Sequence, residues 1–184
     1  MSEFPQATTE TILDPAAIEE AIAVLADNIA KRHPSDLVAL VGIFTRGVVF
    51  AQRLGLALAA RGLHFPVGTL DTSLYRDDFD QHASELPRLN SSDISFVLDD
   101  ATVILCDEVI YTGRTIRAAL DGLMDYGRPA KIELAVLVDR GHRELPIQPD
   151  YTGHIVPTTA TQYVKVYFRE TDTHDEGVFL LTPA

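Results

Sequence analysis

The chain has 184 residues, an apolar fraction of 46% and a formal net charge of −12, from 27 acidic and 15 basic residues. This length and composition predict a globular protein of one domain and exclude a largely disordered chain. The excess of acid argues against a large nucleic-acid surface, because phosphate backbones bind Lys and Arg. The single cysteine, Cys106, excludes an internal disulfide, and its apolar neighbours predict a small buried side chain.

The first ten residues, MSEFPQATTE, contain neither a basic region nor an apolar run and do not resemble a signal peptide. No apolar run in the sequence has the length of a membrane span, so we expect no membrane among its partners. We therefore expect a cytoplasmic protein with a frayed arm over residues 1–10 and a single domain over residues 11–184.

The first half of the chain predicts two helices and two strands. Residues 14–33 carry apolar side chains at helical spacing, and Asp14 is placed to cap that helix. Residues 36–44 are almost wholly apolar, which is typical of a strand buried on both faces. After a short polar break, residues 48–62 predict the second helix, and residues 65–75 predict the next strand.

A long polar segment over residues 76–93 has no regular period, which predicts a functional or disordered loop. Residues 94–109 then predict two strands joined by a turn at Asp99 and Asp100. Residues 115–127 carry a single apolar face and predict the third helix.

The last part of the chain predicts strands and irregular structure. Residues 131–139 form another apolar strand, and residues 140–151 are irregular. Two short late strands are expected over residues 161–171 and 176–183. Because strands alternate with helices, we expect an α/β fold with a parallel sheet and helices on both faces. In such sheets, ligands bind outside the carboxyl ends of the strands.

One strand end combines two acids with a polar loop, in the sequence DEVIYTGRT. Asp107 and Glu108 end an apolar run, where a carboxylate is costly unless something pairs with it. The loop over residues 111–115 leads directly into the third helix, whose N-terminal amide groups favour a phosphate. Ribose hydroxyls donate hydrogen bonds to carboxylates, each worth about 1.5–3 kcal/mol. The segment therefore predicts a site for a sugar phosphate.

The segment ILCDEVIYTGRT resembles the phosphoribosyl diphosphate (PRPP) motif of type I phosphoribosyltransferases. More narrowly, four segments resemble the PyrR family in this order: VGIFTRG, LDTSLYRDDF, DEVIYTGRTIRAALD and LAVLVDRGHRELPI. Members of that family are known as pyrimidine-operon attenuation regulators with uracil phosphoribosyltransferase activity. The resemblance runs from about Ile12 to the last strand. It implies the type I fold, with flanking helices, a small hood region and a flexible hood loop over about residues 75–95.

The resemblance also implies a role for each site residue. The carboxylates of Asp107 and Glu108 would hold the ribose hydroxyls and, largely through substrate and water, Mg²⁺. The 5′-phosphate would be bound by the loop residues Tyr111, Thr112, Gly113, Arg114 and Thr115. The diphosphate would be bound by Thr45, Arg46 and Gly47, with Arg76 closing over it from the hood loop. Arg46 would act in catalysis together with the two acids, and Asp139 and Arg140 would lie beside uracil.

The sequence departs from the family at several positions, which leaves three functions open. The acid pair is Asp-Glu where the family more often has two aspartates, and Gln148 and His154 stand where relatives often carry basic residues. The first function is synthesis of uridine monophosphate (UMP) from uracil and PRPP. The second is a regulator that senses UMP or PRPP, binds the pyr mRNA leader and catalyses little. The third is transfer to another base. The family implies a homodimer or a higher homo-oligomer.

Overall fold

The computed structural model describes residues 8–35, 37–75 and 91–183. Its elements in chain order are β1 (Thr8–Leu13), α1 (Pro15–Arg32), β2 (Val38–Ile43), α2 (Arg46–Ala59), β3 (Val67–Leu70), the 3₁₀ turn η1 (Ser73–Tyr75), β4 (Thr102–Ile110), α3 (Arg114–Leu123), β5 (Lys131–Asp139), β6 (Tyr151–Ile155), β7 (Tyr163–Tyr167) and β8 (Gly177–Thr182). In the described part of the chain, no helix is both long enough and apolar enough to cross a bilayer.

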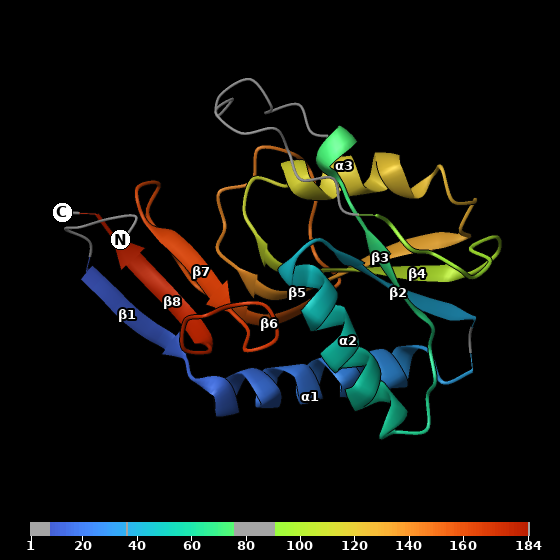
Figure 1. Cartoon of the computed structure of the whole chain (residues 1–184), viewed down its shortest axis with the longest axis horizontal. Coiled ribbons are helices and arrows are strands. Elements are labelled where there is room, and N and C mark those ends of the chain that lie inside the picture. The colour runs from blue at the N-terminus through green and yellow to red at the C-terminus, as the bar shows by residue number, and fades with distance from the viewer. Residues whose placement is uncertain (1–7, 36, 76–90, 184) are drawn as a thin grey trace.

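Five strands form a parallel sheet in the order β3-β2-β4-β5-β6. Figure 1 shows α3 on one side of this sheet and α1 and α2 on the other. All six residues of β2 are buried, as expected for a strand covered on both faces. The predicted α/β fold with flanking helices is therefore confirmed.

Each face of the large sheet has its own apolar core. On one face, α1 packs through Ile18, Ile22, Leu25 and Ile29, the stripe that its sequence predicts. The N-cap is also as predicted, since Asp14 Oδ1 accepts a hydrogen bond from the Ala17 amide at 2.8 Å. On the opposite face, α3 packs into a second apolar cluster.

The strand order creates a divergence between β2 and β4. The chain passes from β2 through α2 to β3 on one side, and from β4 through α3 to β5 on the other. The loops that follow β2 and β4 therefore part at the carboxyl edge of the sheet, which is where open α/β sheets bind ligands.

A smaller antiparallel sheet, in the order β1-β8-β7, lies at one end of the molecule (Figure 1). Residues 8–10, expected in the frayed arm, instead begin β1 and pair with residues 180–182 of β8. Both late strands are confirmed as β7 and β8, but β1 and β6 were not predicted. That residues 11–184 form one domain stays a prediction.

The strand expected over residues 94–98 is wrong. Residues 94–98 form no strand, and the described chain has one isolated β-bridge next to them, between Thr69 and Asp93. Ile94 and Phe96 instead lie over Gly68 of β3, where an added Cβ would come within 3.2 Å of both side chains. The segment therefore covers the apolar cluster with side chains and does not extend the sheet.

Arg53 of α2 joins the small sheet to the helices. Its guanidinium, 8% exposed, pairs with Glu19 of α1 at 2.9 Å and with Glu170 after β7 at 2.7 Å. It also pairs with Glu176 and lies over the Phe168 ring, 4.9 Å from its centroid. These contacts compensate a buried cation and dock the β7–β8 connection on α2.

A buried acid, Glu133 on β5, ties α1 to the far edge of the large sheet. Its carboxylate accepts hydrogen bonds from Lys131 at 2.6 Å and from the Tyr151 hydroxyl at 2.7 Å, and it contacts His33 Nε2 at 2.9 Å. Burial alone would raise the pKa of Glu133. The hydrogen bonds from Lys131, Tyr151 and His33 have the larger combined effect and lower the pKa of Glu133 to about 2.

This network predicts a contribution to stability that depends on pH. The pKa of Glu133 falls from an ordinary 4.5 to about 2, so its contribution is complete above pH 4.5 and is lost as the pH falls through 2. Glu133→Gln should lower the free energy of unfolding at pH 7 by about 1.5–3 kcal/mol. Urea unfolding across this pH range measures the effect. The exposed Glu20→Gln on α1 is the control, and equal losses in both variants would contradict the prediction.

Candidate active site

The two acids of β4 lie at the divergence between the strands. Asp107 is only 6% exposed, and its Oδ1 accepts a hydrogen bond from the Glu108 amide at 3.0 Å. Because side chains alternate along a strand, Glu108 points to the other face, where it is partly exposed. The two carboxylates are thus neighbours in sequence with different surroundings.

The loop after β4 turns through Gly113 into α3. Gly113 has φ of 92°, a left-handed conformation that favours glycine. A Cβ there would meet the Cβ atoms of Leu145 and Ile147, each at 3.5 Å, so residues from beyond β5 support the loop from behind. The Arg114 amide contacts Thr112 Oγ1 at 3.4 Å, within the first turn of the helix.

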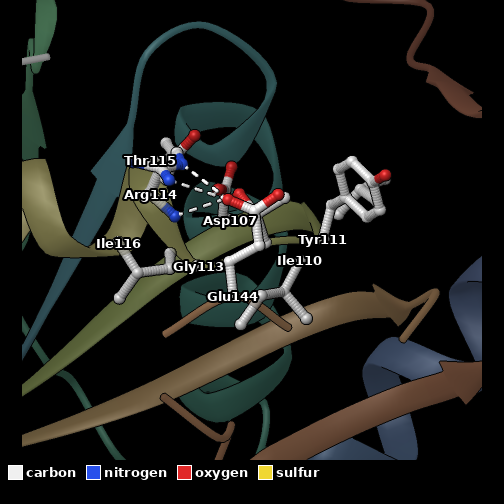
Figure 2. Close-up of a pocket in the computed structure, with 10 residues that line it drawn as sticks. Asp107, Ile110, Tyr111, Gly113, Arg114, Thr115, Ile116 and Glu144 are labelled. Atoms are coloured by element: carbon white, nitrogen blue, oxygen red, sulfur yellow. Dashed lines mark hydrogen bonds and ion pairs between the residues drawn. The ribbon is translucent and has the colours of Figure 1, made fainter. Parts of the chain in front are cut away.

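A cavity of about 340 Å³ joins this loop to the acid of β4. Its lining residues are Asp107, Val109, Ile110, Tyr111, Thr112, Gly113, Arg114, Thr115, Ile116 and Glu144. Figure 2 shows Asp107 beside the backbone that begins α3. A carboxylate and a helix N-terminus therefore share one cavity, as the sequence predicted.

Glu144 belongs to this cavity, although the sequence did not single it out. Its amide donates to the Thr112 carbonyl at 3.0 Å, which places the residue beside the loop. Its carboxylate accepts a hydrogen bond from Arg114 Nε at 2.8 Å, and Figure 2 shows the side chain directed at Arg114. An internal acid therefore pairs with a cation that was expected to bind phosphate.

Gly47, in the first turn of α2, brings the loop after β2 against β4. A Cβ at Gly47 would lie 2.6 Å from the Cys106 carbonyl oxygen and 3.3 Å from Asp107 Oδ1. Thr45 is the N-cap residue of α2, and the peptide bond before it is cis. The absence of a side chain at Gly47 is therefore what allows the first turn of α2 to lie against β4.

Arg46, next to Gly47 and expected to bind diphosphate, is directed to an acid outside the predicted site. Its Nε and Nη2 donate to Asp172, in the connection between β7 and β8, at 3.1 and 2.6 Å. Asp172, and more weakly Glu108, hold the pKa of Arg46 above its usual value. Of the two acids of β4, Glu108 therefore interacts with Arg46 through its charge.

The two residues expected beside the base lie at the end of β5. Asp139 accepts hydrogen bonds from the Gly141 amide at 2.9 Å and from Arg143 at 2.6 Å. Arg140 is buried, and its guanidinium carbon lies 4.0 Å from the centroid of the Tyr111 ring. Arg140 and Tyr111 therefore link the end of β5 to the loop between β4 and α3.

The structure brings together most of the predicted site. Asp107 and residues 111–115 share the cavity, Gly47 touches β4, and Arg140 stacks on Tyr111. Arg76 and most of the expected hood loop lie outside the described residues. Sequence reasoning missed Asp172, which belongs to no motif. It also passed over Glu144, although the segment DRGHREL that contains it was compared with the family.

Comparisons with known proteins agree with this geometry. A family model described as phosphoribosyl transferase domain matches residues 8–168. The "Bifunctional protein PyrR" of Latilactobacillus sakei is 57% identical over 143 residues, 77% of this chain and 79% of that protein. Its namesake in Deinococcus deserti is 47% identical over 90% of this chain and 91% of the relative.

The chain belongs to the PyrR family. Solved structures show the same fold at lower sequence identity. The hypoxanthine phosphoribosyl transferase of Trypanosoma cruzi matches with a TM-score of 0.74 and 17% identity, over 98% of this chain and 94% of that one. An HGPRT-ase from Leishmania tarentolae, solved with GMP, matches with a TM-score of 0.73 and 17% identity, over 97% and 98% of the two chains. The predicted family and the type I phosphoribosyltransferase fold of PyrR are confirmed.

The close approach at Gly47 predicts that this position tolerates no side chain. Gly47→Ala would place a methyl group against backbone atoms of β4, and the overlap should cost about 1–3 kcal/mol of stability. Thermal unfolding measures the loss. Gly55→Ala, in the same helix, is the matched control, because its Cβ would meet only side-chain atoms, the nearest being a Val67 methyl at 3.0 Å. A Gly47→Ala protein as stable as the Gly55→Ala protein would contradict the prediction.

Proposed function

We propose that this PyrR-family chain transfers the phosphoribosyl group of PRPP to uracil and releases diphosphate and UMP. The observation that carries the proposal is the shared cavity of Asp107 and residues 111–115, with the Arg46–Gly47 turn against the same strand. In this arrangement, the loop amides bind the 5′-phosphate and Asp107 binds the ribose hydroxyls, while Glu108, on the other face of β4, adds negative charge at the same strand end. The anomeric carbon then lies between the diphosphate loop and the base.

The reaction breaks the bond from the anomeric carbon to diphosphate and forms a bond to a uracil ring nitrogen, which loses its proton. Positive charge builds on the ribose ring while the bond breaks, and Asp107 and Glu108 stabilise that charge. Arg46 stabilises the negative charge that grows on the leaving diphosphate. No covalent intermediate with the protein is required. Cys106 is not a nucleophile in this scheme, because burial, with a smaller effect of Asp107, raises the pKa of its thiol.

Mg²⁺ is the metal that suits these donors. Among the described residues, no group of three or more His, Cys, Asp or Glu side chains is placed to hold a metal ion. Asp107 and Glu108 supply carboxylate oxygens, which a hard cation prefers, and the remaining ligands would come from substrate and water. When bound, Mg²⁺ offsets the negative charge of the diphosphate.

Uracil is proposed as the base from family membership and from the stacking of buried Arg140 on the exposed Tyr111 ring, which lines the cavity. The solved structures with the same fold include enzymes named for hypoxanthine. Their sequence identity of 17% supports a shared fold but says nothing about the base that this chain uses. A panel of uracil, hypoxanthine and guanine, each with PRPP and Mg²⁺, tests base choice. Turnover of a purine with none of uracil would replace this proposal by transfer to another base.

RNA regulation is the second candidate function, and the relatives' printed name, "Bifunctional protein PyrR", favours it. The positions expected to carry basic residues hold an exposed Gln148 and a partly buried His154, and α1 carries exposed Glu19 and Glu20 after its first turn. Fewer cations release fewer counterions, so affinity for RNA falls. A gel shift with the pyrimidine-operon leader over a range of salt concentrations tests this candidate. A cytoplasmic homo-oligomer is part of the same proposal, and sedimentation tests the assembly.

The proposed mechanism predicts a large effect at Asp107. Asp107→Asn keeps the shape of the side chain but removes a charge beside the reacting ring, so turnover should fall on the order of 10²-fold. Labelled uracil, PRPP and Mg²⁺ provide the assay. Asp121→Asn removes an exposed acid from α3 and should leave turnover unchanged. An Asp107→Asn enzyme within a few-fold of the wild type would count against the mechanism.

The position of Glu144 predicts tighter binding of a phosphate when its charge is removed. Glu144→Gln takes a negative charge from the cavity and frees Arg114 from its ion pair. Since exposed ion pairs are worth about 0.2–1 kcal/mol, the affinity for UMP should rise by a factor of about 1.4 to 5. Calorimetry at low and high salt measures this gain, which should shrink with salt. Asp121→Asn, which breaks a similar exposed pair outside the cavity, should leave the affinity unchanged.

A further inference from the structure

We propose that Asp172 is a positioning residue for the leaving group, holding the Arg46 guanidinium in the orientation that binds diphosphate. Asp172 lies in the connection between β7 and β8, far in sequence from the motifs that predicted the site. The inference rests on the proposed function, which gives Arg46 the diphosphate.

The contact between the two side chains fixes the plane of the guanidinium. Nε of Arg46 donates to Asp172 Oδ2 at 3.1 Å, and Nη2 donates to Oδ1 at 2.6 Å. Two parallel hydrogen bonds from a planar fork to a carboxylate leave no free rotation of either group. The Tyr167 ring, 5.3 Å from the guanidinium carbon, adds a cation–π contact.

Asp172 can orient Arg46 because Asp172 is itself held in place. Its Oδ2 also accepts hydrogen bonds from the Phe168 amide at 2.9 Å and from the Thr171 hydroxyl at 3.1 Å. Its side chain is 9% exposed, against 37% for Arg46. A fixed, buried acid therefore orders a long side chain that reaches toward solvent.

Arg46 keeps donors for a ligand while it is bound to Asp172. A guanidinium carries five N–H donors, and the pair with Asp172 uses one on Nε and one on Nη2. Within the described residues, the remaining N–H groups of Arg46 make no hydrogen bond. Diphosphate can therefore bind to an arginine that is already ordered, and the entropy of ordering is not lost during binding.

The neighbouring pair, Arg53 and Glu170, is a matched control within the same two elements. Arg53 also lies on α2, and it donates to Glu170 from Nε at 2.9 Å and from Nη2 at 2.7 Å. Glu170 and Asp172 share the β7–β8 connection, so both pairs dock that connection on α2. Only the Asp172 pair involves a site residue, and Arg53 keeps Glu19 and Glu176 when Glu170 is changed.

The experiment compares Asp172→Asn with Glu170→Gln in the full-length protein. For Asp172→Asn, KM for PRPP and the calorimetric Kd for PRPP with Mg²⁺ should both rise about tenfold, the effect of weakening a charged hydrogen-bond pair. KM for uracil should change little. The Tm should fall, because the buried Asp172 carboxylate accepts hydrogen bonds from Phe168 and Thr171 as well as from Arg46, so the constants are measured well below the Tm. Glu170→Gln should leave both PRPP constants unchanged. In an Arg46→Gln background, Asp172→Asn should have no further effect on PRPP binding.

Several results would overturn the inference. Unchanged PRPP constants in Asp172→Asn would show that no positioning is needed, and tighter binding would show that Asp172 competes with diphosphate. An equal loss in Glu170→Gln would assign the effect to docking of the β7–β8 connection. A further loss in the Arg46→Gln background would show that Asp172 acts through another group.

Two further measurements keep the inference separate from folding and from the proposed function. If Asp172→Asn does not fold, Arg46→Lys keeps the charge but removes the planar fork, and it should raise the PRPP constants about tenfold. Unchanged constants would then overturn the inference. Wild-type protein that binds PRPP but does not turn over uracil would refute the proposed base, while the Kd comparison would still test Asp172. Wild-type protein that does not bind PRPP would refute both.

Discussion

The contact between the first turn of α2 and β4 is the constraint on which the rest of the site depends. At Gly47, backbone approaches so closely that a single Cβ would come within 2.6 Å of the Cys106 carbonyl oxygen. The strand order makes this contact possible, because the chain leaves β2 and β4 in opposite directions. The contact places the Arg46–Gly47 turn beside Asp107, which shares its cavity with residues 111–115.

Internal acids balance the cations around this contact. Arg46 pairs with Asp172, Arg114 pairs with Glu144, and Arg143 pairs with Asp139 at the end of β5. The pairs differ in burial: Asp172 and Asp139 are mostly buried, whereas Glu144 is half exposed. In the proposed function, the burial of each acid determines its role. The buried Asp172 orients Arg46, whereas the half-exposed Glu144 competes with a phosphate for Arg114.

Local patterns explain which parts of the fold were predictable. The buried runs of β2 and β4 and the capped stripe of α1 are signals that a short window of sequence contains. β1 and β6 are mostly exposed or half-buried, so no apolar run marks them in the sequence. Residues 94–98 have the composition of a strand, but their apolar side chains cover Gly68, and pairing stops after one bridge.

The sequence by itself determined the acid pair, the glycine turn into α3 and membership in the PyrR family, because these features are contiguous and each motif carries its own chemistry. Tertiary structure alone decided which acids face the arginines. Arg114 meets Glu144 across 30 residues, and Arg46 meets Asp172 across 126. A pair formed over such separations has no period or spacing in the sequence, since it exists only where packing brings two distant surfaces together.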